Sequence, residues 1–443
     1  MAAWREMSAA ELGRGIEAGQ ICPVALSEHF LDTIRDERLT PRIYARLMER
    51  QALDQAMAAR ARARSGLRRG PLDGVPVAWK DNFDTAGVAT EAGSALLKGR
   101  VPAEDAQAVA RLTGAGMPPL GKTHMTELAF SGLGLNPITA SPPCVNDAEA
   151  ASGGSSSGSA AAVAHGLAPV ALGTDTGGSV RLPAAWNDLV GLKTTSGRLS
   201  LQGVVPLAAR FDTVGPLART VEDAALVFGL LDASPAPDLR GADTAGLRLL
   251  MIETVALDDL HPTVAQGFED AVERLARAGA HVTRAAIPAM AEAMELAGIL
   301  YTSECWGTWG TVIDADPDAM FAPVRARFQA GAVHKASDYV AASQRLDALR
   351  ADWASQTAGY DAVILPSAAN LPPKAAHLLT DATAFAAENL LTLRNTRIGN
   401  MAGGCCLTVP TGTPSVGLSL IAPPFDEARL LRMGAAVERT LAA

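Results

Sequence analysis

The sequence has little of several features that mark particular classes of protein. Cysteine occurs five times in 443 residues and never as a CxxC pair, so we expect no disulfide framework and a reducing compartment. No run of residues is apolar for long enough to span a membrane, and the N-terminal stretch lacks the apolar segment of a secretory signal. These absences predict a cytoplasmic protein without a membrane partner.

Positive charge is also scarce. Lys and Arg number 38 against 47 Asp and Glu, which gives a formal net charge of −9. Without a basic block we expect no nucleic-acid partner. The seven histidines are scattered and show neither HExxH nor another ligand spacing, so we expect no metal site and no cofactor.

An ordinary apolar content of 48% is present, and the chain is long enough to bury a large core. Helical and strand patterns alternate along it. Helices are expected from residue 9, after the capping box Ser8–Glu11, and at 25–36, 51–65, 106–112, 158–165, 262–278 and 427–441. Strands are expected at 75–80, 170–173, 246–252, 281–285, 362–365 and 416–421. The alternation predicts an α/β fold with a largely buried mixed sheet and one domain spanning 1–443.

Two short patterns match known motifs but lack the structural context of those motifs. Gly116–Thr123 fits the phosphate-binding loop GxxxxGK[ST], yet Pro118 and Pro119 have no N–H for a phosphate. A strand that begins near Gly121 is the better interpretation. Gly154–Gly158 fits the nucleophile elbow GxSxG, with Ser156 as nucleophile, but no strand precedes it.

Two further features point to chemistry when they are taken together. In Gly173–Arg181, two glycines precede Ser179, and consecutive N–H groups there form either an oxyanion hole or an ordinary tight turn. Lys80 ends an apolar run, where burial would lower its pKa and make it a base. The alternative is that its side chain extends to the surface and stays charged. With the Ser-rich loop around Ser155, these are the components of a Ser–Ser–Lys hydrolase.

The same segments, in this order, resemble the amidase-signature family. The resemblance is carried by Gly74–Asn82, by the loop Gly153–Ala160 and by Gly173–Ala184, and it continues at 191–193, 212–216, 219–224, 361–366 and 424–428. It implies a single α/β/α layered domain around a large mixed sheet. It also implies an enzyme that cleaves an amide C–N bond through an acyl-serine intermediate. Ser152 and Thr194 replace prolines that are common in the family, outside the expected catalytic positions.

Carried over residue by residue, the resemblance implies that Ser179 is the acylated nucleophile and Lys80 the base. Ser155 matches the serine between them, which follows a cis peptide bond. The remaining positions are the oxyanion-hole residues Thr176, Gly177 and Gly178, which act with the N–H of Ser179, the loop-fixing pair Asp175 and Arg181, and the acyl-pocket residue Ser131. Arg181 facing an anionic substrate is the alternative for that residue, whereas for Ser131 an ordinary loop serine is the favoured interpretation.

Several alternatives for the function stay open within this resemblance. One is the glutaminase subunit of a tRNA-dependent amidotransferase, which usually carries an ARYDG-like stretch where this chain has Gly298–Gly307; another is a ureido-acid hydrolase of the allophanate or carboxybiuret type. A stand-alone amidase that releases ammonia or an amine from a small-molecule amide is favoured. Retention of all three catalytic residues disfavours a binding protein without chemistry. Family analogy suggests a homodimer. The run Leu391–Arg397 offers Arg394 and Arg397 either to bind a carboxylate or to cap a helix.

Overall fold

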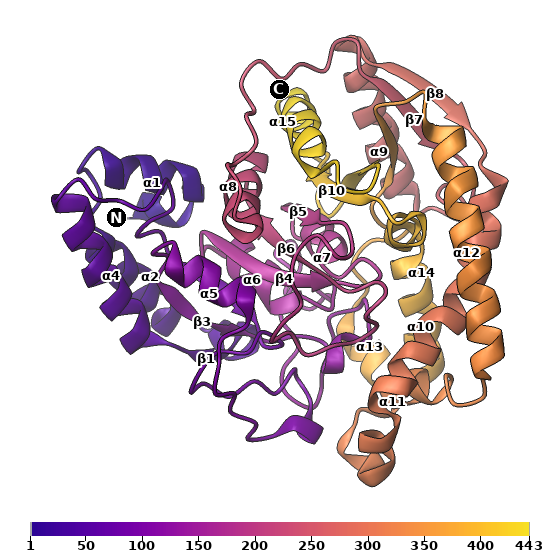
Figure 1. Cartoon of the computed structure of the whole chain (residues 1–443), viewed down its shortest axis with the longest axis horizontal. Coiled ribbons are helices and arrows are strands. Elements are labelled where there is room, and N and C mark those ends of the chain that lie inside the picture. Colours follow the sequence, from indigo (N-terminus) through magenta and orange to yellow (C-terminus); the bar gives the residue numbers. More distant parts are fainter. Residues whose placement is uncertain (1, 443) are drawn as a thin grey trace.

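An eleven-stranded mixed sheet runs through the protein in the order β1-β3-β2-β4-β6-β5-β10-β11-β9-β7-β8 (Figure 1). The computed structural model describes residues 2–442. The strands are β1 Tyr44–Leu47, β2 Val77–Lys80, β3 Pro119–Thr123, β4 Val170–Asp175, β5 Val190–Lys193, β6 Thr213–Ala218, β7 Arg248–Ile252, β8 His281–Ala285, β9 Ala362–Pro366, β10 Cys405–Pro410 and β11 Gly417–Ala422. Parallel pairing joins β3, β2 and β4, and also β9, β7 and β8, while the other pairs are antiparallel.

Helices cover this sheet. They are α1 Ala9–Glu17, α2 Pro23–Asp36, α3 Thr40–Ile43, α4 Glu49–Arg64, α5 Gln107–Gly114, α6 Ser157–Ala164, α7 Arg181–Trp186, α8 Val221–Asp232, α9 Pro262–Arg277, α10 Pro288–Ala315, α11 Ala322–Gln329, α12 Ala336–Thr357, α13 Ala375–Thr380, α14 Ala382–Ala402 and α15 Glu427–Ala442. Short 3-10 helices lie at Ala2–Arg5, Ala95–Leu97, Glu127–Ala129 and Pro317–Ala319. Figure 1 shows α1, α2 and α4 at one end of the molecule and α10 and α12 at the other. Within residues 2–442, no helix combines the length and the apolar character needed to cross a bilayer.

The apolar core is divided by the sheet into two clusters. One contains side chains from α1, α2, α6, α8, α9 and α15, and the other contains side chains from α10, α11, α12 and α14. In β9, Ile364 belongs to the first cluster, whereas Val363 and Leu365 belong to the second. Successive side chains of a strand point to opposite faces, so the two clusters lie on opposite faces of the sheet. This is the predicted α/β/α layering.

Most of the expected elements are confirmed to within a few residues. The capping box forms as predicted, because Ser8 Oγ accepts a hydrogen bond from the N–H of Glu11 and the Glu11 carboxylate accepts one from the N–H of Ser8. The helix at 262–278 and the strand at 281–285 are present as α9 and β8. The strand expected near Gly121 is β3, which begins two residues earlier, at Pro119. Strands such as β4 and β6 are buried at every residue, as expected where helices cover both faces.

The long helices between β8 and β9 and before β10 are the main elements that the sequence pattern does not indicate. In α10, buried side chains recur every three or four residues from Met290 to Ile313, and α11, α12 and α14 pack against the helix. Apolar residues such as Leu296, Ile299 and Val312 lie outside this buried stripe, so the sequence shows no clear contrast between an apolar and a polar face of the helix. The run Leu391–Arg397 lies in the middle of α14, so its arginines do not cap a helix.

Candidate active site

Two neighbouring parallel strands bring the chemistry-bearing segments together. In the pairing of β2 with β4, Ala78 is opposite Ala171 and Trp79 is opposite Leu172. The carboxyl ends of both strands therefore lie at the same edge of the sheet, which is where open α/β sheets usually bind ligands. Lys80 is the last residue of β2, and β4 leads directly into the segment that contains Ser179.

Lys80 is fully buried at this edge. Its Nζ donates hydrogen bonds to Ser155 Oγ at 2.8 Å and to Thr174 Oγ1 at 2.7 Å. Asn82 Nδ2 also donates to Thr174 Oγ1, at 3.0 Å. Burial lowers the pKa of Lys80 to about 7, although the charges of Asp212 and Asp175 act in the opposite direction. About half of these side chains are therefore neutral near pH 7 and able to accept a proton.

The Ser-rich loop lies across this strand end, and the peptide bond between Gly154 and Ser155 is cis. The N–H of Thr126 donates to the carbonyl of Ser155 at 3.2 Å. The N–H of Ser156 donates to the carbonyl of Ser179 at 3.2 Å, which joins the loop to the segment after β4. The hydroxyl of Ser156 instead donates to the carbonyl of Thr174, at 3.2 Å. Ser155 is thus the loop serine that meets Lys80, while Ser156 is engaged with the backbone just before α6.

The segment after β4 lines a cavity. Thr176, Gly177 and Ser179 contribute to the walls of a space of about 320 Å3 that is partly open to solvent. In the described part of the chain, the N–H groups of these three residues donate no hydrogen bond. The N–H of Gly178 differs, because it donates to Asp175 Oδ1 at 2.9 Å. Three of the four expected oxyanion donors are therefore free.

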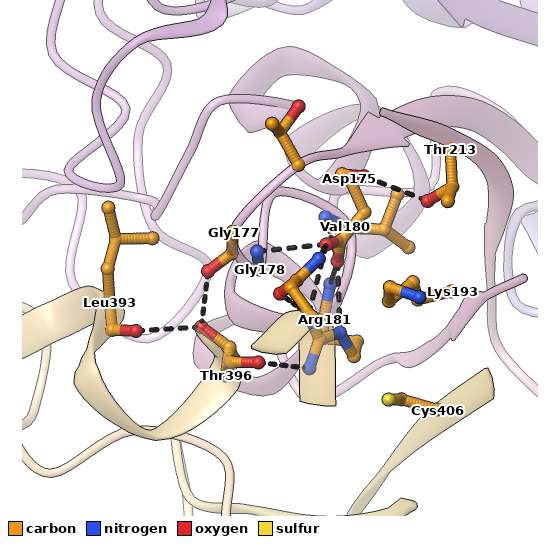
Figure 2. Close-up of polar contacts among 12 residues, drawn as sticks. Asp175, Gly177, Gly178, Val180, Arg181, Lys193, Thr213, Leu393, Thr396 and Cys406 are labelled. Atoms are coloured by element: carbon orange, nitrogen blue, oxygen red, sulfur yellow. Dashed lines mark hydrogen bonds and ion pairs between the residues drawn. The ribbon is translucent and has the colours of Figure 1, made fainter. Parts of the chain in front are cut away.

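Gly178 has a geometric reason to be glycine. Its φ of +127° lies in a region that other residues rarely adopt, and an added Cβ would lie 1.9 Å from Thr396 Oγ1. Thr396, on α14, donates from Oγ1 to the carbonyl of Gly177 at 2.9 Å. Figure 2 shows this helix lying directly against the Gly177–Gly178 turn.

Asp175 and Arg181 form a buried ion pair behind this turn (Figure 2). The Arg181 Nε and Nη2 atoms donate to the two carboxylate oxygens of Asp175, each at 3.0 Å. The remaining guanidinium nitrogen, Nη1, donates to the carbonyl of Thr396 at 2.5 Å, and Nη2 also reaches Asn400 Oδ1 at 2.6 Å. Burial alone would raise the pKa of Asp175, but the Arg181 charge holds it well below its usual value. Arg181 lies behind the cavity wall, so it ties the turn to α14 and does not face a substrate.

Ser131 lies in the cavity wall. Its Oγ donates to Asn389 Oδ1 of α14 at 3.0 Å, and the N–H of Gly132 donates to the same oxygen at 2.8 Å. The serine therefore holds its loop against α14 as well as lining the cavity.

Other residues at the cavity wall, or in contact with it, come from distant parts of the chain. Tyr301 of α10 donates from its hydroxyl to the carbonyl of Thr176 at 2.9 Å. Asp212 accepts a hydrogen bond from Thr176 Oγ1 at 2.5 Å, and burial raises the pKa of this carboxyl group to about 6. Arg327 of α11 and Arg397 of α14 complete the wall. Tyr301, Asp212 and Arg397 lie in runs that the sequence itself singles out. Arg327 lies in none of them, because α11 reaches the site through tertiary packing alone.

Metal-binding geometry is missing from the described residues 2–442. No group of three or more His, Cys, Asp and Glu side chains is placed there so that it could hold a metal ion. A larger hollow of about 1160 Å3 lies elsewhere, and its lining includes Trp353, Tyr360 and Phe425 but none of the residues that surround Lys80.

The chain is similar in sequence and structure to known amide-hydrolysing proteins and their relatives. The model of the family described as Amidase matches residues 28–431. The chain is 34% identical over 450 residues to a 2-amino-5-chloromuconic acid deaminase of Comamonas testosteroni, covering 98% of this chain and 96% of that one. It is 33% identical over 483 residues to a Glutamyl-tRNA(Gln) amidotransferase subunit from Thermobifida fusca, with the same coverage of both chains. A solved structure described as an amidase superposes with a TM-score of 0.88 at 30% identity, over 98% of this chain and 99% of that chain.

Proposed function

The chain belongs to the amidase family and is an amide-hydrolysing enzyme, and from this premise we propose that Ser179 is its nucleophile, with Ser155 and Lys80 as the proton relay. The observation that carries the proposal is the buried hydrogen bond between Lys80 and Ser155, 2.8 Å long, at a lysine with a pKa of about 7. A serine hydroxyl is a weak nucleophile and needs such a base.

The reaction proceeds in two halves. Ser179 Oγ forms a bond to the amide carbonyl carbon while its proton passes to Ser155, and the Ser155 proton passes to neutral Lys80. The tetrahedral intermediate then collapses, the C–N bond breaks, and the amine leaves with a proton returned through Ser155. A water molecule attacks the acyl-serine by the same route, which releases the carboxylic acid and restores Ser179 and neutral Lys80.

The developing oxyanion is stabilised by the free N–H groups that line the cavity. Thr176, Gly177 and Ser179 provide them, while Gly178 supplies the backbone shape and bonds to Asp175. Removal of one such donor typically costs about 3 to 4 kcal/mol of transition-state stabilisation. Asp175 and Arg181 act by position, because their ion pair fixes the turn against α14.

The test is ammonia release from a panel of primary amides by the wild type, Ser179→Ala and Ser156→Ala. Ser156 is the matched control because its N–H donates to the carbonyl of Ser179, its hydroxyl is bonded to the backbone, and it is the nucleophile of the alternative GxSxG interpretation. We expect release to fall by about 10^4-fold or more in Ser179→Ala and to persist in Ser156→Ala. Loss in Ser156→Ala with retention in Ser179→Ala would reverse the assignment.

A second candidate is the glutaminase of a tRNA-dependent amidotransferase, because relatives named as parts of such an amidotransferase match nearly the whole chain. The cavity wall contains no acidic side chain among its residues, so nothing in it would pair with the ammonium group of glutamine. We therefore place a stand-alone amidase first. Hydrolysis of L-glutamine only on addition of a partner protein would favour the second candidate.

Three further expectations from the sequence stay predictions. They are a single catalytic domain over 1–443, a homodimer and a cytoplasmic location. The sheet that takes strands from Tyr44 to Ala422 supports the first. Light scattering of the purified chain tests the second, and fractionation of the source cells tests the third.

A further inference from the structure

Two arginines of the cavity wall have no partner for their charge. Within residues 2–442, neither Arg327 nor Arg397 donates a hydrogen bond or pairs with a carboxylate. The Nε atom of each is buried without a partner, although each side chain as a whole is only partly buried. A buried N–H donor without an acceptor is costly, so such a group is normally hydrogen-bonded. The two arginines therefore form a positively charged site that can bind an anion.

The two charges are held by aromatic rings and lie near each other. The Arg327 guanidinium carbon lies 4.4 Å from the ring centre of Phe130, and that of Arg397 lies 5.6 Å from the ring centre of Tyr301. Cation–π contact orients a guanidinium without neutralising it. Burial, together with the nearby Arg397 charge, lowers the pKa of Arg327 to about 9. A guanidinium group is not deprotonated in proteins near neutral pH, so both side chains carry a positive charge.

The pair is also close to the expected reaction centre. Arg397 follows Thr396, whose hydroxyl bonds to the carbonyl of Gly177. Tyr301, which lies under Arg397, bonds to the carbonyl of Thr176. Ser179 and both arginines line the same cavity, which is partly open to solvent. An anionic group held by the arginines would thus be only a few atoms from the amide carbonyl.

The residues of the cavity wall indicate which charged group of a ligand can bind there. Its residues are Ala129, Phe130, Ser131, Thr176, Gly177, Ser179, Leu207, Tyr301, Arg327, Leu393 and Arg397. They include two cations and no carboxylate, so an ammonium group would be repelled there. A planar carboxylate, in contrast, matches the guanidinium fork.

We propose that the substrate is a short amide whose acyl chain ends in a carboxylate, with no ammonium group beside it, and that Arg327 and Arg397 bind this carboxylate. The inference rests on the proposed function, since it assigns the acyl group that Ser179 receives. It assigns the two arginines as substrate-binding residues that determine specificity.

The first test uses the wild-type enzyme and three matched amides. Succinamate carries the carboxylate, butyramide replaces it with a methyl group, and L-asparagine adds an ammonium group to succinamate. We expect kcat/KM for succinamate to exceed that for each of the other two by about 100-fold, as for a charge-assisted contact made in a buried site. Equal or faster hydrolysis of butyramide would overturn the inference while leaving the amidase function intact.

The second test uses variants of the pair. Arg397→Gln and Arg327→Gln are each expected to lower the succinamate-to-butyramide ratio by about 10- to 100-fold. Arg394→Gln is the matched control, because Arg394 lies on the same helix but donates to the carbonyl of Asp258 and is absent from the cavity wall. It should leave the ratio unchanged. An unchanged ratio in both folded test variants would overturn the inference.

A binding measurement separates this inference from the proposed function. In Ser179→Ala, which cannot be acylated, succinate should raise the melting temperature, and this rise should disappear when Arg397→Gln is added. That result supports the carboxylate site even if no amide of the panel is hydrolysed, an outcome that would count against the proposed function alone. No rise with succinate in Ser179→Ala would overturn the inference.

Discussion

The pH dependence of amide hydrolysis should report the titration of one buried lysine. Lys80 must be neutral to accept a proton, and burial places its pKa at about 7. We therefore expect kcat/KM to rise about tenfold per pH unit below pH 7 and to become level above about pH 8. Activity rises with pH because Lys80 acts as a base, and a base is active in its deprotonated form.

The size of the effect can be worked out from the same shift. At an ordinary lysine pKa near 10.5, only about one side chain in 3,000 would be neutral at pH 7, whereas a pKa near 7 makes about half of them neutral. Burial among Ser155, Thr174 and the end of β2 therefore increases the reactive fraction by about three orders of magnitude. This gain corresponds to about 4 to 5 kcal/mol.

A single variant distinguishes Lys80 from the other group that titrates nearby. Burial raises the pKa of Asp212 to about 6, and the negative charge of Asp212 raises the pKa of Lys80. In Asp212→Asn, the midpoint of the profile should move to lower pH if Lys80 is the titrating base. The assay is ammonia release from about pH 5 to about pH 9. Disappearance of the midpoint in Asp212→Asn, or a midpoint near 10 in the wild type, would refute the reasoning.

Three further predictions concern stability. Arg181→Met removes one partner of a buried ion pair and should lower the free energy of unfolding by about 3 to 5 kcal/mol in urea titration. Gly178→Ala should lower it by about 2 to 3 kcal/mol, because the new Cβ would meet Thr396 at a positive φ, whereas Gly177→Ala, whose Cβ would meet nothing within 4 Å, should leave it unchanged. Lys80→Met should abolish activity yet raise the free energy of unfolding by about 2 kcal/mol at neutral pH. The pKa of Lys80 is lower in the folded protein than in the unfolded chain, so its contribution to stability is present above pH 10.5 and is lost as the pH falls towards 7. A lower melting temperature of Lys80→Met at neutral pH would contradict the expected gain in stability.

The fold could be predicted where local signals agree with the final packing. A capping box marks the start of α1, and Pro262 with an amphipathic pattern marks α9. The helices α10 and α14 could not be found in this way. In α10, apolar residues also lie outside the buried stripe, and in α14 many of the buried residues are polar. The order of the strands is equally beyond local patterns. It depends on pairings such as that of β5 with β10, more than 200 residues apart in the sequence.

For the candidate site, sequence resemblance located the residues that belong to continuous motifs. Lys80 and Ser155 are indeed in contact, and Ser131 lines the same cavity as Ser179. Arg327 could not be predicted, since α11 carries more than one arginine and only its packing turns this one towards the cavity. The catalytic motifs are local in sequence, whereas the residues that would select the substrate are assembled by the tertiary structure.

The central claim is that Ser179 carries the acyl group, and covalent labelling tests it most directly. The enzyme would be treated with a serine-directed sulfonyl fluoride and with an activated ester, digested, and mapped by mass spectrometry. We expect each adduct on Ser179, with labelling strongly reduced in Lys80→Met because the base is missing. Labelling of Ser156 or Ser155 in the wild type, with Ser179 unmodified, would contradict the account.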